Sequence, residues 1–352
     1  GTGGIRVVSK AGDASLSISG PGSLEVNVDR NDSGISLIGS KNVNLNIDGA
    51  DVKTLAAYYY GVDLHAGDGF KAAAVVNNGK LTAGGSGGIG IYYRWTNPSD
   101  SGTSSLTVSG NAVVDTRDSK ILIASQASEV QVSAGSDGNG GIVFDGKSGT
   151  VYGNVTLDDP LTVGAGETLT IPEGSTLTVP EGATLTNNGT ITVQSGGTLE
   201  GTPTGNGTVE YKVTGVSLDK ATLELFTGGS ETLTATFQPA NATNQDVTCQ
   251  SSNPDVATVV GGTVKAVGEG EATIIVTTVD GGYTATCKVT VTQAIYSISA
   301  DISPDFGSVY TGYDRPAAQT VTITNTGNQT LNLEQPASTK SFEVGNLSKT
   351  PL

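Results

Sequence analysis

Three short segments of this chain begin 27 residues apart and share one pattern, in which apolar residues alternate with other residues after a glycine. They are Gly34-Ile-Ser-Leu37, Gly61-Val-Asp-Leu64 and Gly88-Ile-Gly-Ile91. A fixed period of this length is typical of a solenoid, in which each coil buries an apolar face by stacking on its neighbour. Looser copies at Lys120–Ile123 and Gly141–Phe144 predict that the stack continues.

Side chains alternate between the two faces of an extended segment, so each copy predicts two residues on one inward face. These pairs are Ile35 with Leu37, Val62 with Leu64, and Ile89 with Ile91. A coil of this length has room for about three short strands. The sequence predicts the other strands at Ser23–Val28, Val43–Ile47, Lys71–Val76 and Ser105–Val108.

The composition favours an all-β protein with neither a nucleic-acid partner nor a membrane span. Alternating β-branched residues are punctuated by Gly, Asn, Asp and Pro, and no convincing amphipathic helix is found. The net charge is −16, from 18 basic and 34 acidic residues, whereas phosphate binding needs clustered cations. No apolar run in this fragment approaches the ~20 residues of a membrane-spanning helix. The missing initiator Met and signal peptide predict a mature or excised fragment.

Residues 1–211 are predicted to form one continuous solenoid whose repeat shortens towards its end. Glu167–Gly174 and Ser175–Gly182 are consecutive eight-residue units, each with the pattern of one strand followed by a Pro-Glu-Gly corner. The whole region resembles the right-handed parallel β-helix of the pectate-lyase-like superfamily. The resemblance covers the repeat pattern and includes no catalytic signature.

Residues 212–292 have a different pattern, with about seven short strands separated by turns. The strand blocks are Val213–Lys220, Leu233–Asn241, Val247–Pro254, Val256–Val259, Gly262–Gly268, Gly270–Val276 and Ala285–Val291. Their order resembles the bacterial immunoglobulin-like domain of group 2, which implies a small β-sandwich. Cys249 stands where that family usually has a core Trp, so Cys287 or Phe237 is expected to fill the volume. The two cysteines form either one disulfide or two small buried apolar groups.

Residues 293–352 are predicted to be part of a second immunoglobulin-like domain. Asp305–Val309 and Val321–Gly327 are similar to the opening strands of the abnormal-spindle/hydin type. A sandwich of this kind needs about 100 residues, so the domain is expected to be partial. The predicted fold class is therefore all-β, a right-handed parallel β-helix followed by immunoglobulin-like β-sandwich domains.

A search for chemistry predicts no catalytic residue, no cofactor and no metal. His65 is the only histidine, which argues against a His/Cys zinc site and against a Ser-His-Asp triad. The glycines of Gly85–Gly90 match GxGxxG but run into a strand, so they are interpreted as a corner between coils. Asp137–Gly141 lacks the acids of a calcium loop. Paired aspartates, such as Asp48 with Asp51, lie where turns are expected.

Exposed aromatic rings on one flank of the solenoid are the candidate ligand-binding site. Tyr92 follows the inward Ile91, so it should point outward beside His65 of the preceding coil and Ile38 before that. Arg94 should share this face, and Trp95 opens a loop that lengthens the next interval. Rings beside polar groups can stack on sugars. The candidate ligand-binding residues are Tyr59, Asp63, His65, Tyr92, Arg94 and Trp95.

We therefore interpret the chain as a non-catalytic, adhesin-like protein, secreted or held on a bacterial surface. It is expected to bind a polysaccharide or a host glycoconjugate through this flank, with the immunoglobulin-like domains as spacers. One alternative is a β-helix polysaccharide lyase or glycoside hydrolase, which predicts a carboxylate cluster with Lys or Arg near Asp63 or Asp115. Another is a purely structural surface stalk that binds nothing.

Overall fold

The structure is a computed structural model of the 352-residue chain. It describes residues 4–28, 32–85, 87–93, 102–117, 119, 122–123, 130–301, 312, 314, 317–338, 343–347 and 351. Over these residues the protein is all-β and has no helix. The chain forms two compact units, Gly1–Thr214 with Phe237–Gln245 and Gly215–Thr236 with Asp246–Leu352.

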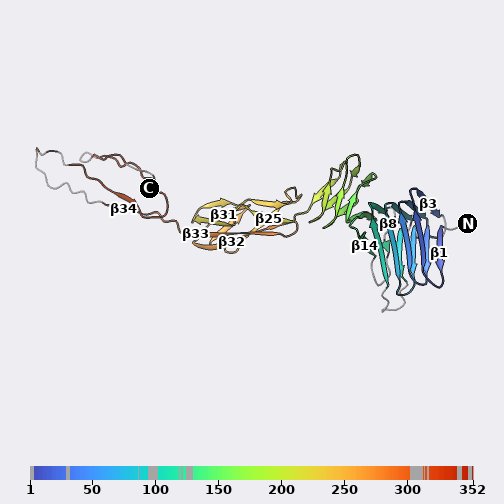
Figure 1. Ribbon diagram of the computed structural model, residues 1–352. Helices are drawn as coiled ribbons and strands as arrows, with labels where there is room; N and C mark the ends of the chain where they lie inside the picture. The colour runs from blue at the N-terminus through green and yellow to red at the C-terminus, as the bar shows by residue number, and fades with distance from the viewer. Residues whose placement is uncertain are drawn as a thin grey trace. The chain divides into compact units, whose positions relative to one another are not determined.

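In the first unit, each of the strands β1 to β12 pairs in parallel with the third strand after it, which carries the pattern to residue 145. This pairing builds three sheets, each of which takes every third strand. Their strands are coloured blue to green in Figure 1. The first sheet holds β1 (Ile5–Ser9), β4 (Ile35–Gly39), β7 (Val62–Ala66), β10 (Ile89–Tyr93) and β13 (Leu122–Ile123). The second holds β2 (Ala14–Ser19), β5 (Val43–Asp48), β8 (Lys71–Asn77), β11 (Thr103–Ser109) and β14 (Gln131–Ala134). The third begins with β3 (Ser23–Val28), β6 (Asp51–Ala56), β9 (Lys80–Gly85), β12 (Ala112–Asp115) and β15 (Gly141–Asp145).

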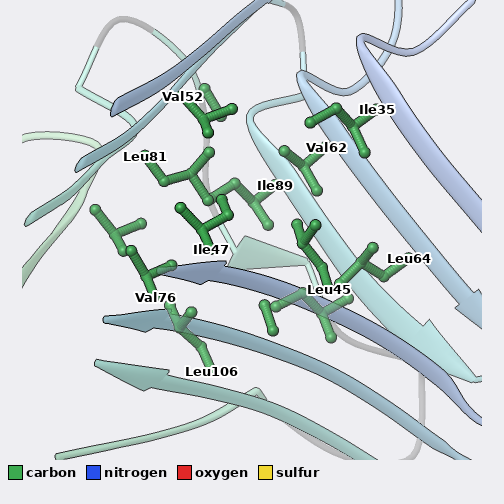
Figure 2. Packing of buried hydrophobic residues seen from close by; sticks show 14 of the residues in the cluster. Ile35, Leu45, Ile47, Val52, Val62, Leu64, Val76, Leu81, Ile89 and Leu106 are labelled. Carbon is green, nitrogen blue, oxygen red and sulfur yellow. The ribbon is translucent and has the colours of Figure 1, made fainter. Parts of the chain in front are cut away.

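The 27-residue period is confirmed as a strand register. Val62 lies opposite Ile35 on one side and Ile89 on the other, and Leu64 pairs in the same way with Leu37 and Ile91. All six side chains are fully buried, as the alternation predicted. They pack against apolar residues of the other two sheets, and Figure 2 shows Leu45, Ile47, Val52, Val76, Leu81 and Leu106 converging on them.

The glycines that open the first two copies have a steric cause. A Cβ on Gly34 would lie 2.6 Å from the carbonyl oxygen of Gly61, and one on Gly61 would lie 2.7 Å from Oγ1 of Thr54. The Gly61 carbonyl also joins two strands, because the N–H of Ile35 donates to its oxygen at 2.9 Å. A side chain at Gly34 would therefore push apart two strands that must pair, and one at Gly61 would collide with Thr54 and Ala83 of the third sheet.

The chain reverses direction after β15. β16 (Ser148–Tyr152) pairs antiparallel with β15 through the two-residue turn Gly146–Lys147, and the strands that follow are parallel to β16. Gly146 has φ +55°, a value that favours glycine at this position of a tight hairpin turn. β19 (Thr168–Ile171), β22 (Thr190–Val193) and β24 (Thr208–Tyr211) complete the third sheet. Two new sheets hold β17 (Asn154–Thr156) with β20 (Thr176–Thr178) and β23 (Thr198–Glu200), and β18 (Leu161–Val163) with β21 (Leu185–Asn187).

The eight-residue units are confirmed as one strand and one corner each. β19 and β20 lie in consecutive units and belong to different sheets, and the corner glycines Gly174 and Gly182 have positive φ. Two of the looser copies differ from prediction. Gly141–Phe144 is wrong as a further copy, because β15 extends the third sheet and not the first. In the Lys120–Ile123 copy, Leu122 and not Ile121 lies opposite Ile89, which shifts the expected register by one residue.

Between residues 215 and 292, the strands form three groups around a separate core. Every strand block predicted for residues 212–292 contains a strand, whereas β26 and β27 were not predicted. The core includes Val264, Ile274, Val289 and Cys287. One pair is β25 (Gly215–Leu218) with β28 (Ala235–Gln238), and a four-stranded sheet holds β26 (Thr222–Phe226), β33 (Thr284–Thr292), β32 (Gly270–Thr278) and β29 (Val247–Ser251). A three-stranded sheet holds β27 (Ser230–Thr232), β31 (Thr263–Ala266) and β30 (Ala257–Val260).

Both cysteines are free thiols, so the disulfide alternative is wrong. Cys287 is fully buried in the core, and burial raises the pKa of its thiol. Cys249 is half-buried and packs against the same core. Further along the chain, β34 (Ile298–Ala300) pairs antiparallel with β35 (Ile323–Asn325), which falls within the predicted block Val321–Gly327. Asp305–Val309 lies outside the described residues.

Candidate functional site

The predicted flank is the outward face of the first sheet. Its strand register aligns two rows of outward positions across neighbouring strands. One row runs through Arg6, Ser36, Asp63 and Gly90, and the other through Val8, Ile38, His65 and Tyr92. The predicted neighbours of Tyr92 are therefore in place at the backbone level. The side chain of Tyr92 lies outside the described residues, as do Arg94 and Trp95 entirely.

Asp63 interacts with the buried Ser36 and with Tyr60. Its Oδ2 accepts a 3.5 Å hydrogen bond from Oγ of Ser36, which is buried. Burial, together with the negative charge of Asp63, raises the pKa of Tyr60. The Tyr60 ring lies over Gly87, where a Cβ would come within 2.5 Å of the ring. This tyrosine therefore packs on the backbone and is not available as a free ring.

Two exposed rings precede β7, those of Tyr58 and Tyr59, with 66% and 49% of the residue surface accessible. The exposure expected of Tyr59 is confirmed, but Tyr58 is exposed as well. Alternation followed back from the inward Val62 would turn Tyr59 outward and Tyr58 inward. It does not apply to Tyr58, because residues 57–59 form a bend and the strand begins only at Val62. Two adjacent tyrosines on a bend offer a wider apolar surface than the single ring that alternation predicts.

A second group of charged side chains lies elsewhere in the first unit and joins Asp115, Arg117 and Glu167. The Arg117 guanidinium donates from Nε to Asp115 Oδ1 at 3.0 Å and from Nη2 to Asp115 Oδ2 at 2.7 Å. Its Nη1 lies 3.3 Å from Oε2 of Glu167. The guanidinium carbon sits 4.4 Å from the centre of the Phe144 ring, a cation–π geometry. The cluster thus has two carboxylates and one cation, as the enzyme alternative expected near Asp115.

The contacts within this cluster favour a structural role. Asp115 is only 8% exposed, and Oε2 of Glu167 also accepts the N–H of Gly164 at 2.7 Å. Burial would raise the pKa of Asp115, but hydrogen bonds from Arg117 and the attraction of Arg117 and Lys80 outweigh it and lower that pKa. Arg117 and Glu167 were not identified from the sequence, where 50 residues separate them and no repeat relates them.

Two other motifs considered in the sequence, Asp137–Gly141 and Gly85–Gly90, have no ligand-binding pattern over their described residues. Asp137 accepts the N–H and the side-chain amide of Asn139 at 3.1 and 2.7 Å, which is the pattern of an Asx turn. The glycine motif that ends at Gly90 leads into strand β10 and not into a helix. In the described part of the chain, no three His, Cys, Asp or Glu side chains gather as metal ligands would. Nor does that part hold a helix with the length and hydrophobicity to cross a membrane.

Comparison with known proteins identifies one region of the chain. Residues 212–289 match the family described as bacterial Ig-like domain (group 2). These residues are a bacterial immunoglobulin-like domain. The resemblance predicted for 212–292 is thereby confirmed over most of its length.

Two curated relatives also match parts of the chain. An Ig-like virion protein of Serratia phage KSP90 is 44% identical over 81 residues, which are 22% of this chain and 31% of that protein. A minor capsid protein of Enterobacteria phage T3 is 44% identical over 92 residues, which are 26% of this chain and 21% of that protein. The chain therefore spans about a third of the first relative and about a fifth of the second.

Proposed function

We propose that this chain is a non-catalytic structural protein displayed outside the cell, on a bacterial surface or on a phage virion. The observation that carries the proposal is the bacterial immunoglobulin-like domain. Stretches of 81 and 92 residues that are 44% identical to an Ig-like virion protein and to a minor capsid protein also support it. In such a role the immunoglobulin-like domain is a spacer. An acidic protein of net charge −16 is suited to an exposed position in solvent.

The architecture that we propose for the first 211 residues is a right-handed parallel β-helix, followed by immunoglobulin-like domains at 212–292 and 293–352. Its support is the parallel pairing of β1 to β12, each with the third strand after it, and the parallel pairing that resumes after the β15–β16 reversal. Apolar residues aligned across neighbouring strands, such as Ile35, Val62 and Ile89, also support it. A stack of this kind presents a long and rigid flank, because each strand is hydrogen-bonded on both sides.

The ligand that we propose for this flank is a neutral glycan. Tyr58 and Tyr59 expose their rings, and the half-buried Asp63 and His65 lie on the strand that follows. Aromatic rings stack on the apolar C–H face of a sugar, while neighbouring polar groups bond its hydroxyls. We include Tyr92, Arg94 and Trp95 in the proposed surface because the sequence places them on the same flank.

Binding to a glycan array tests this proposal, with the full chain as probe. We expect the double variant Tyr58→Ala/Tyr59→Ala to bind its best glycan about threefold to tenfold more weakly, as loss of stacked rings costs roughly 1 kcal/mol. Tyr296→Ala is the matched control, since that tyrosine is 69% exposed but belongs to the second unit. If no mucin, plant or bacterial glycan is retained by the wild type, the adhesive role is wrong and the purely structural stalk replaces it.

The enzyme alternative rests on the Asp115 cluster and is tested separately. A lyase or hydrolase would release products from pectin-like polysaccharides, and Asp115→Asn would abolish that release. We expect no product from the wild type, because both carboxylates of the cluster are bonded to Arg117 and Asp115 is buried. Turnover by the wild type that disappears in Asp115→Asn would establish the enzyme and overturn the non-catalytic proposal.

A further inference from the structure

The first unit contains two separate hydrophobic cores. The first gathers buried residues from Ala14 to Val143, and the second gathers buried residues from Ile142 to Val193. The two cores divide at strand β15. Val143 belongs to the first core, whereas its neighbours Ile142 and Phe144 belong to the second, and all three are buried. This single strand therefore packs on both of its faces.

The reversal of the chain falls at the same place. Strands before β15 run parallel to one another, and those after the Gly146–Lys147 turn run parallel to β16. Only the third sheet continues across the reversal, through the antiparallel pair β15 and β16. The first and second sheets end at β13 and β14, and new sheets begin at β17 and β18. We call β15, its turn with β16, Asn111 and Arg117 the junction.

Side chains at the junction supply hydrogen bonds to the strands that open the new sheets. The Oδ1 of Asn111 accepts the N–H of Thr156, on β17, at 2.8 Å, and its Nδ2 donates to Asp158 at 2.9 Å. The Nη1 of Arg117 donates to the carbonyl of Thr162, on β18, at 2.6 Å. Both β17 and β18 have a strand partner on one side only among the described sheets. Asn111 and Arg117 thus form hydrogen bonds with backbone groups of β17 and β18 that pair with no neighbouring strand.

We propose that the first unit is built from two cooperative modules, residues 4–145 and 148–214, that can open separately at the junction. Each module has its own core, and elements with separate cores open locally with their own free energies. The contacts that couple the modules include the β15–β16 ladder, Asn111 and the Arg117 cluster. Ile142 and Phe144 also pack in the second core, and Asn154 forms backbone hydrogen bonds with Gly138 and Gly140. The junction is thereby a built-in point of local opening in a protein that is otherwise a continuous stack.

Adjacent substitutions in β15 test this division, because they reach different cores. We expect Val143→Ala to speed amide hydrogen exchange in residues 32–85 about tenfold or more, and to change residues 168–200 by less than about twofold. Ile142→Ala should do the reverse. The measurement is native-state hydrogen exchange by mass spectrometry on the full chain. Lys53→Met, which removes an exposed ion pair with Glu25, is the control and should change neither region.

A second variant tests the coupling. Arg117→Met keeps the apolar stem of the side chain but loses its bonds to Asp115, Glu167 and Thr162. We expect it to speed exchange in β17 and β18 about tenfold or more while residues 32–85 keep the wild-type rate. The proposal is overturned if either β15 variant speeds exchange equally in both regions, or if Arg117→Met loosens residues 32–85 as much as β18. It is independent of any glycan result.

Discussion

Gly61 lies at a corner where Thr54 and Ala83 leave no room for a side chain. We expect Gly61→Ala to lower the free energy of unfolding of the first unit by about 2 kcal/mol, because a new methyl group would overlap Thr54 and Ala83. Urea denaturation of the full chain, followed by circular dichroism, measures this. Gly12→Ala is the matched control, since its Cβ would find its nearest neighbour at an ordinary 3.7 Å. Equal stability of the two variants would contradict the steric explanation of the repeat.

Residue positions inside the repeat could be predicted from the sequence because one rule governs them all. Val62 is buried for the same reason as Ile35 and Ile89, so three copies reinforce a single interpretation. Tyr58 shows where that rule stops, because it belongs to a bend and no alternation applies there. The glycine of each copy was visible in the sequence. The atoms that exclude a side chain, the Gly61 carbonyl at Gly34 and the Thr54 hydroxyl at Gly61, needed the structure.

At the scale of elements, the Asp115 cluster joins β12 to the segments around β15, β18 and β19. The folded-state pKa of Asp115 lies below that of an exposed aspartate. Its contribution to stability is therefore complete above about pH 4 and is lost as the pH falls through the lowered value. We expect Asp115→Asn to be less stable than wild type by about 2 kcal/mol at pH 7. The difference should shrink as the pH falls below about 4, because protonation of the wild-type carboxylate removes its charge.

Urea midpoints measured between pH 7 and pH 2 on both proteins check this pH dependence. Glu25→Gln serves as the control, because Glu25 forms an ion pair with Lys53 that is exposed on both sides. A destabilisation of Asp115→Asn that stays constant over this pH range would mean that the carboxylate charge is not what stabilises the cluster.

Individual strands were more predictable than their connection. The eight-residue units after residue 166 have the same β-branched pattern as the earlier repeat, so nothing in their composition marks a change of direction. The reversal depends on a two-residue turn at Gly146–Lys147, which is too short a signal to stand out among 50 glycines. The pairing of Arg117 with Glu167 depends in turn on that reversal, and no periodicity could have revealed it.

At the scale of the whole molecule, the immunoglobulin-like domain has a core of its own. Every buried residue of that core lies between Leu223 and Val291, so its apolar burial needs nothing from residues 1–211. Residues 237–245 are an exception within this stretch of sequence, since they group with the first unit. There Thr243 donates its N–H to the carbonyl of Tyr211 and accepts the N–H of Tyr211 at its hydroxyl, both at 2.9 Å.

The last prediction follows from that division. Residues 212–293 expressed alone should fold to an all-β state and unfold in one cooperative transition, because one core and its three groups of strands are retained. Only residues 237–245 should exchange amide hydrogens faster than in the full chain, since the bonds of Thr243 to Tyr211 are lost. Calorimetry and hydrogen exchange measure the two effects. If the isolated segment is unfolded, its stability depends on the rest of the chain, and it cannot act as an independent spacer.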